Sequence, residues 1–260
     1  MAKAIYRGVS GVARKVKQPS RGVSGVSRKV KNAWRGVSGV ARGCFSGGAP
    51  LSSLAVGSSV YMNVNGTRTQ FLVVHQGVPS SLYDSSCDGT WLMMNEIYAS
   101  QKLQDGNGKY NYGTSFMHKW LNKEFLGMLD SSIQSIVKEV KIPHCYGTSQ
   151  PTSGTSGLSA KVFLPSAIEV NYSTSTTVKD GACWSYFSGC LAPKRIAYKG
   201  GVAYAWWSRT TNIYPSGGVY FATNGGGQEY GDLTSSYGMR PSMVLPKETL
   251  VDASFNVLAS

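Results

Sequence analysis

One stretch of the chain, residues 204–237, has the composition of a surface that recognises a partner without covalent chemistry. It contains five Tyr, six Gly, four Ser and two Asn, which together make up half of its 34 residues. Tyrosine supplies a large contact area at a low cost in conformational entropy, and Ser, Gly and Asn adapt their hydrogen bonds to a partner. We therefore predict ligand binding here, with a glycine-rich surface loop that has no partner as the alternative.

The candidate contact residues of this stretch lie between two anchors. Tryptophans in a strand most often belong to the core, and a buried arginine usually bonds to backbone carbonyls. We expect Trp206, Trp207, Arg209 and Arg240 to be structural in this way. The candidate ligand-binding residues are Ser208, Thr210, Thr211, Asn212, Tyr214, Tyr220, Phe221, Thr223, Asn224, Gln228, Tyr230, Asp232 and Thr234.

Residue patterns that support catalysis or metal binding are missing from the sequence. It contains no nucleophile elbow, no phosphate-binding loop and no zinc-protease motif. His75, His118 and His144 lie far apart in the chain, each without an obvious histidine or carboxylate partner. Asp105 begins a short calcium-loop-like sequence, but the later ligands of such a loop are absent. We predict no enzymatic activity, no catalytic residues, no metal and no cofactor.

The five cysteines give no sign of a metal site or a disulfide framework. Cys44, Cys87, Cys145, Cys183 and Cys190 are odd in number and form no CxxC pair. We expect small buried thiols in a reducing compartment.

The positive charge of the chain is concentrated at its N-terminus. Residues 1–43 carry eleven of the 26 Lys and Arg and none of the 13 Asp and Glu. The remaining residues, with 15 basic and 13 acidic side chains, are nearly neutral. Electrostatics therefore gives no reason to expect nucleic acid on the globular region.

This basic segment is an internal repeat. Three copies of RGVSGV begin at Arg7, Arg21 and Arg35, so the period is 14 residues. Recurring valines and glycines favour short strands and turns over helices. Each copy is too small to bury a core alone, so the units should pair with other chains or dock on a larger body. A disordered basic tail is the alternative.

The rest of the chain predicts one globular domain. Asn65-Gly66 stands between two alternating runs, which is a strong hairpin signal. A helix should begin near Ser115, with Phe116, Trp120, Leu121 and Met128 at helical spacing, and a second should carry Ile133, Ile136, Val137 and Val140. Strands are expected within 161–165 and over much of the second half. Helices and strands that are segregated along the chain indicate an α+β fold.

We divide the chain into basic repeats (1–46), a linker (47–58), a ligand-binding domain (59–248) and a C-terminal tail (249–260). The N-terminus has no apolar segment typical of a signal peptide, and no apolar run is long enough for a membrane helix. We therefore expect synthesis in the cytoplasm and no membrane insertion.

Several segments of the globular region carry a resemblance to a known family. They read VNGTRTQFLVVHQGVPSSLYDSSCDGTWLM, VKIPHCYGT, GLSAKVFLPSAIEV, SYFSGC, AYAWWSR and SYGMRPSMVLP. From about residue 53 to 246 the chain resembles a domain family of unknown function that is common in gut-bacterial phages and prophages. The N-terminal repeat resembles the GVxGVARKVKK repeats that often precede this domain in phage structural proteins.

The closing pattern, WW-x-R followed by a variable stretch and GMRP, also resembles the C-type-lectin-like fold. Formylglycine-generating enzymes and the variable proteins of diversity-generating retroelements share that fold, and in the latter mutagenesis alters surface positions on a constant scaffold. The resemblance implies that the candidate residues lie on the surface. The family usually has WWLRSP where this chain has WWSRTT (206–211). Either Ser208, Thr210 and Thr211 are altered sites, or the loop has drifted.

The resemblance implies a virion protein of a phage or prophage, at the tail tip or fibre, that binds a protein or glycan receptor on the host cell. The repeats would bind other virion proteins or hold a homo-oligomer, with a trimer expected first. Replacing Tyr220 and Tyr230 by Ala should then abolish adsorption and leave the melting temperature nearly unchanged.

Three other interpretations remain open at the level of sequence. The globular region could decorate the particle without a receptor. It could be an enzyme of the formylglycine-generating type, although that chemistry needs a reactive cysteine pair or a histidine metal site. The basic repeats could be a nucleic-acid-binding arm, a partner that we do not expect from the sequence.

Overall fold

The computed structural model describes the backbone of six strands within residues 5–45. It then describes residues 48–105, 110–146, 151–172, 178–189, 192–212 and 218–259. The contacts within the chain divide it into two compact units, Met1–Gly48 and Ala49–Ser260.

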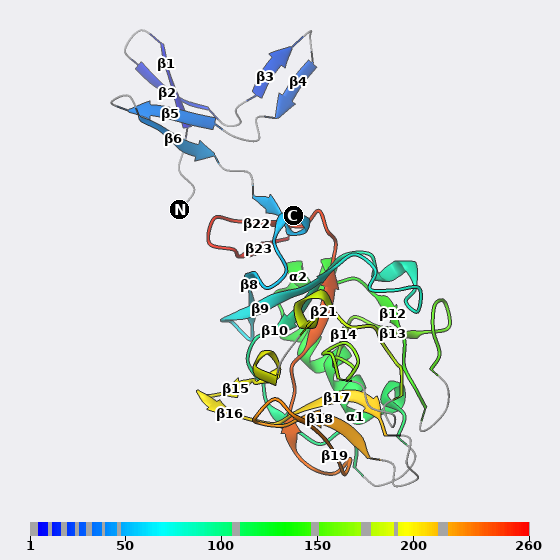
Figure 1. The fold of residues 1–260 in the computed structure, drawn as a ribbon. Helices are drawn as coiled ribbons and strands as arrows, with labels where there is room; N and C mark the ends of the chain where they lie inside the picture. The colour runs from blue at the N-terminus through cyan, green and yellow to red at the C-terminus, as the bar shows by residue number, and fades with distance from the viewer. Residues whose placement is uncertain are drawn as a thin grey trace. The chain divides into compact units, whose positions relative to one another are not determined.

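The N-terminal unit consists of three antiparallel hairpins, one for each repeat (Figure 1). In the first hairpin the register pairs Val9 with Val12, so two residues separate the strands. The prediction of short strands over the repeats is confirmed. The hairpins are β1 (Ile5–Val9) with β2 (Val12–Val16), β3 (Ser20–Val23) with β4 (Val26–Lys29), and β5 (Ala33–Val37) with β6 (Val40–Phe45).

The globular unit contains two five-stranded sheets (Figure 1). In the first sheet the strand order is β14-β21-β10-β9-β8, and all neighbouring strands are antiparallel. Its strands are β8 (Ser59–Val64), β9 (Thr67–Gln76), β10 (Thr90–Met94), β14 (Val162–Phe163) and β21 (Ser242–Leu245).

The second sheet has the order β11-β20-β17-β18-β19. Its neighbouring strands are antiparallel except β17 and β20, which run parallel where Trp206 pairs with Gly238. Its strands are β11 (Ser100–Gln101), β17 (Trp206–Thr211), β18 (Val219–Ala222), β19 (Gln228–Gly231) and β20 (Tyr237–Gly238).

Short helices and small sheets complete the globular unit. The helices are α1 (Phe116–Trp120), a π-helical turn (Leu121–Phe125) that continues it, and α2 (Ser131–Ile136). Two further hairpins pair β12 (Val140–Ile142) with β13 (Leu158–Ala160), and β15 (Tyr198–Lys199) with β16 (Val202–Ala203). Single 3₁₀ turns occupy Leu51–Ser53, Ser85–Cys87, Tyr112–Thr114, Ser185–Phe187 and Ala192–Arg195. Mostly antiparallel sheets with few helices confirm the predicted α+β class.

Two local signals in the sequence are confirmed. Asn65 and Gly66 form the turn between β8 and β9 with φ angles of 50° and 73°, values that Asn and Gly tolerate better than other residues. Ser115 caps α1, since its Oγ accepts a hydrogen bond from the backbone N–H of His118 at 3.1 Å.

The buried stripe of the first helix differs from the prediction. Met117, Leu121 and Phe125 are buried, whereas Phe116 is 38% exposed. The π-helical turn at Leu121 widens the spiral for the positions that follow it, so Leu129 is buried in place of the predicted Met128. Phe116 is the first residue of α1 and precedes this turn, so the turn does not explain its exposure. Val140 lies in β12 and not in the second helix.

From Ala49 on, the predicted linker belongs to the globular unit, as does the predicted tail. A three-stranded antiparallel sheet joins β7 (Ala49–Pro50), β22 (Leu250–Val251) and β23 (Val257–Leu258). Leu51, inside the predicted linker, is completely buried. Pairing between residues about 200 positions apart cannot be seen in the composition of a short polar segment.

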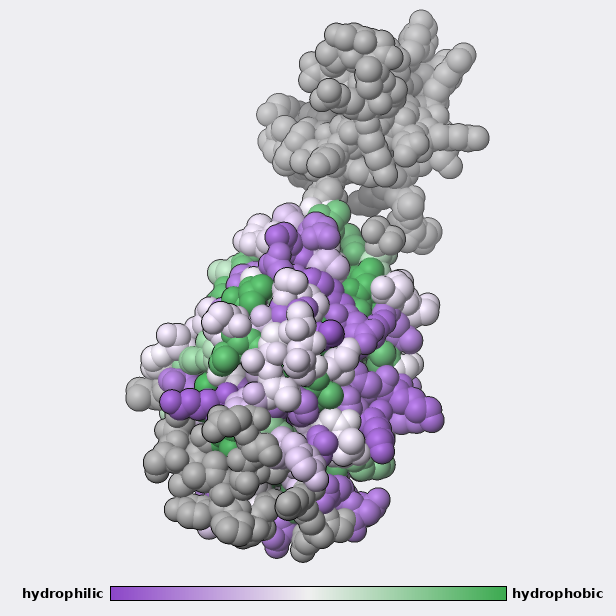
Figure 2. Space-filling model, turned by 90° about the vertical axis from the view of Figure 1, so that its right-hand side faces the viewer, coloured by the Kyte–Doolittle hydropathy of each residue, from purple (hydrophilic) through white to green (hydrophobic). Residues whose placement is uncertain are grey.

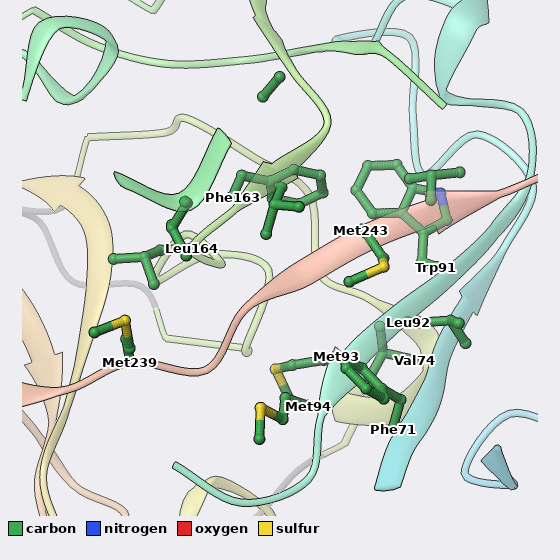
Figure 3. Packing of buried hydrophobic residues seen from close by; sticks show 14 of the residues in the cluster. Phe71, Val74, Trp91, Leu92, Met93, Met94, Phe163, Leu164, Met239 and Met243 are labelled. Atoms are coloured by element: carbon green, nitrogen blue, oxygen red, sulfur yellow. The ribbon is translucent and has the colours of Figure 1, made fainter. Parts of the chain in front are cut away.

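The main core lies against the first sheet and is rich in aromatic and methionine side chains (Figure 3). Trp91 of β10 is fully buried, and its ring contacts those of Tyr83, Phe163 and Trp184 at centroid distances of 5.5–5.7 Å. The indole N–H donates to the carbonyl of Gly77 at 2.8 Å. Cys87 and Cys145 are buried free thiols, as expected for these two.

Candidate ligand-binding site

The register of the second sheet gathers several aromatic residues on one of its faces. Trp207 pairs with Phe221, and Phe221 pairs with Glu229 on the next strand. Paired residues lie on the same face of a sheet, so Trp207, Phe221 and Glu229 form a row across β17, β18 and β19. Tyr237, from β20, contacts both Trp207 and Phe221 through its ring.

This face carries an open pocket of about 460 Å³. Its volume lies within the range that is typical of small-ligand sites. The pocket is formed by the end of β16, the residues just before β17, β18 with the turn that follows it, β19 and the start of β20. The lining residues are Ala203, Tyr204, Ala205, Phe221, Thr223, Asn224, Glu229, Ser236 and Tyr237.

An aromatic cluster supports the pocket. Phe221 and Tyr237 are stacked, with ring centroids 4.1 Å apart and planes inclined by 25°. Fully buried Trp207 contacts both rings edge-on, at 4.7 Å from Tyr237 and 5.9 Å from Phe221. Its indole N–H donates to the carbonyl of Gln101 at 3.0 Å, which fixes the orientation of the ring. The aromatic part of the pocket is therefore held in place before any ligand binds.

Polar side chains surround these rings. Thr223, Asn224 and Ser236 offer hydroxyl and amide groups, and Glu229 offers a carboxylate. Asn224, Glu229 and Ser236 are exposed. Aromatic surface next to a few convergent polar groups can bind and orient an organic ligand.

Figure 2 shows how hydrophobic residues are distributed on one face of the globular unit. On the described part of that face of the globular unit, hydrophobic residues form small separate areas between hydrophilic ones. The pocket of the second sheet is the site that we consider for ligand binding, because it combines aromatic rings with convergent polar groups.

The structure corrects the expectation that all the candidate residues lie on the surface. Six of them are buried, with exposed fractions of 5% or less: Ser208, Thr210, Thr211, Asn212, Tyr220 and Phe221. Thr223 and Gln228 are half-buried, whereas Asn224, Tyr230, Asp232 and Thr234 are exposed. Tyr214 lies outside the described residues.

Internal hydrogen bonds explain why polar residues of β17 can be buried. The Ser208 hydroxyl donates to the carbonyl of Tyr220 at 2.8 Å, and the Thr210 hydroxyl donates to the Asp180 carboxylate at 2.7 Å. A buried hydroxyl with a partner avoids the cost of an unsatisfied polar group. These two side chains are therefore parts of the framework and are not available to a ligand.

Only three of the candidate residues line the pocket, namely Phe221, Thr223 and Asn224. Most of the pocket lies within residues 204–237, the stretch that composition singles out, but composition does not indicate Glu229 or Ser236. Tyr204 and Tyr237, at the two ends of the stretch, are also absent from the predicted contact residues. The strand register identifies Glu229, which pairs with Phe221, and ring stacking places Tyr237 beside Phe221. Tyr204 and Ser236 lie just before β17 and β20 and are found only from the pocket itself.

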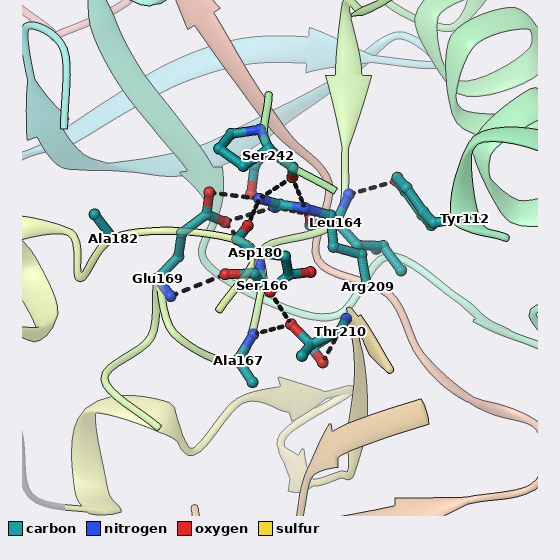
Figure 4. Close-up of polar contacts among 12 residues, drawn as sticks. Tyr112, Leu164, Ser166, Ala167, Glu169, Asp180, Ala182, Arg209, Thr210 and Ser242 are labelled. Atoms are coloured by element: carbon teal, nitrogen blue, oxygen red, sulfur yellow. Dashed lines mark hydrogen bonds and ion pairs between the residues drawn. The ribbon is translucent and has the colours of Figure 1, made fainter. Parts of the chain in front are cut away.

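Arg209 of β17 organises a buried polar network with neighbouring loops (Figure 4). Its guanidinium pairs with the Glu169 carboxylate through two hydrogen bonds of 2.6 and 2.8 Å. It also donates to the backbone carbonyls of Pro143, Leu164 and Asp180 at 2.8–3.3 Å. Arg209 thus ties β17 to three loops.

Asp180 is the unusual titratable group of this network. Burial raises the pKa of its carboxyl to about 7, although Arg209 and the Thr210 hydroxyl act in the opposite direction. One oxygen accepts from Thr210, and the other has no hydrogen-bond partner. A carboxyl in this setting tends to be neutral, because its charged form is poorly solvated.

Arg240 has a comparable structural role. It lies between β20 and β21, where the chain passes from the second sheet to the first. Its guanidinium donates to the carbonyls of Met94 and Asn95 at 3.1 and 3.0 Å, and it lies over the Trp206 ring at 5.0 Å. The prediction that Trp206, Trp207, Arg209 and Arg240 are buried structural residues is confirmed.

The three histidines lie apart from the pocket. His75 accepts a hydrogen bond from the backbone N–H of Ser185, and His144 is bonded to the Thr152 hydroxyl at 2.8 Å. His118 contacts the Asn122 amide, and burial lowers the pKa of His118 to about 4. Within the described ranges, no three His, Cys, Asp or Glu residues are grouped as metal ligands would be.

The comparisons with known proteins place the central part of the chain in a family. The family model described as "Domain of unknown function (DUF6273)" matches residues 88–247, more than half of the sequence. The chain belongs to the DUF6273 family. The DUF6273 match includes all of the second sheet and so the whole pocket. No curated protein and no solved structure matches the chain. The helices in the described part of the chain are all too short or too polar to cross a membrane.

Proposed function

We propose that the globular unit is the receptor-binding domain of a phage or prophage virion protein, located at a tail tip or tail fibre. In this proposal the pocket on the second sheet binds a protein or glycan on the surface of the host cell. The observation that carries it is the open pocket of about 460 Å³, with stacked Phe221 and Tyr237 at its base and exposed polar residues around them.

The residues of the pocket favour recognition over catalysis. Among the described residues that line it, Glu229 is the one carboxylate, and there is no histidine or cysteine. General acid–base and nucleophilic catalysis usually need a second titratable group within hydrogen-bond reach. Aromatic rings with hydroxyl and amide neighbours are instead typical of binding surfaces.

The finer proposal for the fold is a C-type-lectin-like domain. It is supported by the WW-x-R and GMRP segments, since both arginines are buried where they join strands to neighbouring loops. Among the described candidate residues, burial leaves Asn224, Tyr230, Asp232 and Thr234 exposed as positions for diversification. The buried side chains of residues 208–211 favour drift as the reason why WWSRTT departs from the usual family sequence.

The N-terminal hairpins have a separate role in this proposal. They bind other virion proteins or hold a homo-oligomer, with a trimer as the first expectation. Short two-stranded units are marginal in isolation, which supports a role in assembly.

Electron microscopy of virions labelled with an antibody against this protein tests its location. The proposal expects label at the tail tip or along a fibre. Label confined to the capsid would contradict receptor binding and support the alternative that the domain only decorates the particle.

A further inference from the structure

The hairpins of the N-terminal unit place arginines directly opposite one another. The register pairs Arg7 with Arg14 in the first hairpin, Arg21 with Arg28 in the second, and Arg35 with Arg42 in the third. The same relationship therefore occurs three times, once in every repeat. The sequence gives the 14-residue period, but the pairing of its two arginines follows only from the register.

A pair of valines accompanies each arginine pair on the same face. In the first hairpin Val9 pairs with Val12, two positions along each strand from the arginines. Residues two apart in a strand share a face, so one face of the hairpin carries both pairs. Lys15 follows Arg14 directly and belongs to the opposite face, at the position paired with Tyr6.

Opposed arginines are unfavourable unless an anion accompanies them. Like charges at directly opposite positions of an antiparallel pair destabilise it. Residues 1–43 contain no Asp or Glu that could compensate, and the rest of the chain is nearly neutral. The neutralising charge must therefore come from a binding partner or from salt.

We infer that the three arginine pairs bind nucleic acid. The planar guanidinium group matches the geometry of phosphate and binds it through two hydrogen bonds. A nucleic acid backbone offers phosphates at a regular spacing, which suits a basic unit repeated with a constant period. Three weak sites on one chain also reinforce each other when they engage one polymer. This inference does not depend on receptor binding by the globular unit.

The test measures binding of fluorescent oligonucleotides of about 30 nucleotides to the full-length protein, between about 50 and 300 mM salt. Single-stranded and duplex DNA are used in parallel to identify the form that is bound. The variant R14Q/R28Q removes one arginine from each of two pairs. Its matched control, K15Q/K29Q, removes the same charge from the neighbouring positions on the opposite face.

For R14Q/R28Q we expect affinity to fall about tenfold or more, and the slope of log K against log salt to become shallower by about 2. K15Q/K29Q should lose less than about threefold. A third variant, R14K/R28K, keeps the net charge and should show an intermediate loss, because lysine binds phosphate as a point charge.

Three results would overturn the inference. Equal losses in R14Q/R28Q and K15Q/K29Q would mean that diffuse charge, and not the arginine pairs, attracts DNA. Competition by polyglutamate as strong as that by unlabelled DNA would indicate an acidic polypeptide as the partner. Absence of binding by the wild-type protein at the lowest salt concentration would exclude nucleic acid altogether.

Discussion

Phe221 and Tyr237 come from different strands of the second sheet, yet their rings stack with centroids 4.1 Å apart. Trp207 contacts both from the buried side. Replacing Tyr237 by Ala removes this stack and leaves a gap, so we expect a loss of about 2 kcal/mol of unfolding free energy. Tyr237→Phe keeps the ring and should change the value by less than about 0.5 kcal/mol. Urea denaturation measures both, and equal effects would show that the ring does not support the site.

Tyr220 and Tyr230, two of the candidate ligand-binding residues, should behave differently when replaced by Ala. Tyr220 is 4% exposed and Tyr230 is 55% exposed, although they are paired in the sheet. Tyr220→Ala should cost about 3 kcal/mol and lower the melting temperature, which corrects the expectation of an unchanged value. Tyr230→Ala should cost at most about 1 kcal/mol. Differential scanning calorimetry distinguishes them, and matching melting temperatures would contradict the burial of Tyr220.

The ion pair of Arg209 and Glu169 should be costly to break from one side. Both side chains are completely buried, so Arg209→Met leaves an unpaired carboxylate in the interior. We expect a loss of about 3–5 kcal/mol. The double variant R209M/E169L should recover part of this loss, because it removes both charges. Chemical denaturation of the two variants measures the coupling, and a cost below about 1 kcal/mol for Arg209→Met would be inconsistent with this network.

Asp180 should make stability depend on pH. Its folded-state pKa of about 7 lies above the ordinary value for Asp, so the folded protein holds this proton more tightly than the unfolded chain does. The resulting stability is present at low pH and is lost as the pH rises from about 4 through 7. The loss is on the order of a few kcal/mol.

Asp180→Asn should remove this dependence, since an amide stays neutral and keeps an oxygen for the Thr210 hydroxyl. Asp232→Asn, at an exposed position, is the control. It should leave the slope of unfolding free energy against pH unchanged. Denaturation curves recorded between about pH 4 and 8 measure the free energy of unfolding at each pH for both variants and the wild-type protein. An unchanged slope in Asp180→Asn would mean that the carboxyl titrates in its ordinary range.

Strong local signals allowed parts of the fold to be predicted from sequence. Asn65-Gly66 needs little context to form its turn, and Ser115 caps its helix through one hydrogen bond to a near neighbour. The structural roles of Arg209 and Arg240 followed from their positions beside tryptophans and a proline. The contacts that fulfil these roles come from distant segments such as Glu169 and Met94, and no local pattern indicates them.

From the sequence, the pocket could be placed only within residues 204–237, and the individual residues that line it could not be chosen. Ser208 and Thr210 are small and polar, which is typical of a surface, but partners from β18 and from the loop at Asp180 allow them to be buried. An irregularity in the pairing of β17 with β18, between Trp207 and Thr211, also breaks the simple alternation of faces. For these reasons the choice of pocket residues required the register.

The central claim is tested most directly by binding of labelled full-length protein to a panel of gut-bacterial isolates, measured by flow cytometry. Two matched pairs of variants separate the pocket from the remaining surface: Glu229→Gln against Glu248→Gln, and Tyr204→Ala against Tyr198→Ala. In each pair the first residue lines the pocket and the second does not.

We predict that the wild-type protein binds at least one isolate. Glu229→Gln and Tyr204→Ala should weaken that binding about tenfold, because each loses a contact with the ligand. Glu248→Gln and Tyr198→Ala should stay within about twofold of wild type. Equal binding by all four variants, or no binding of the wild-type protein to any isolate, would contradict the account.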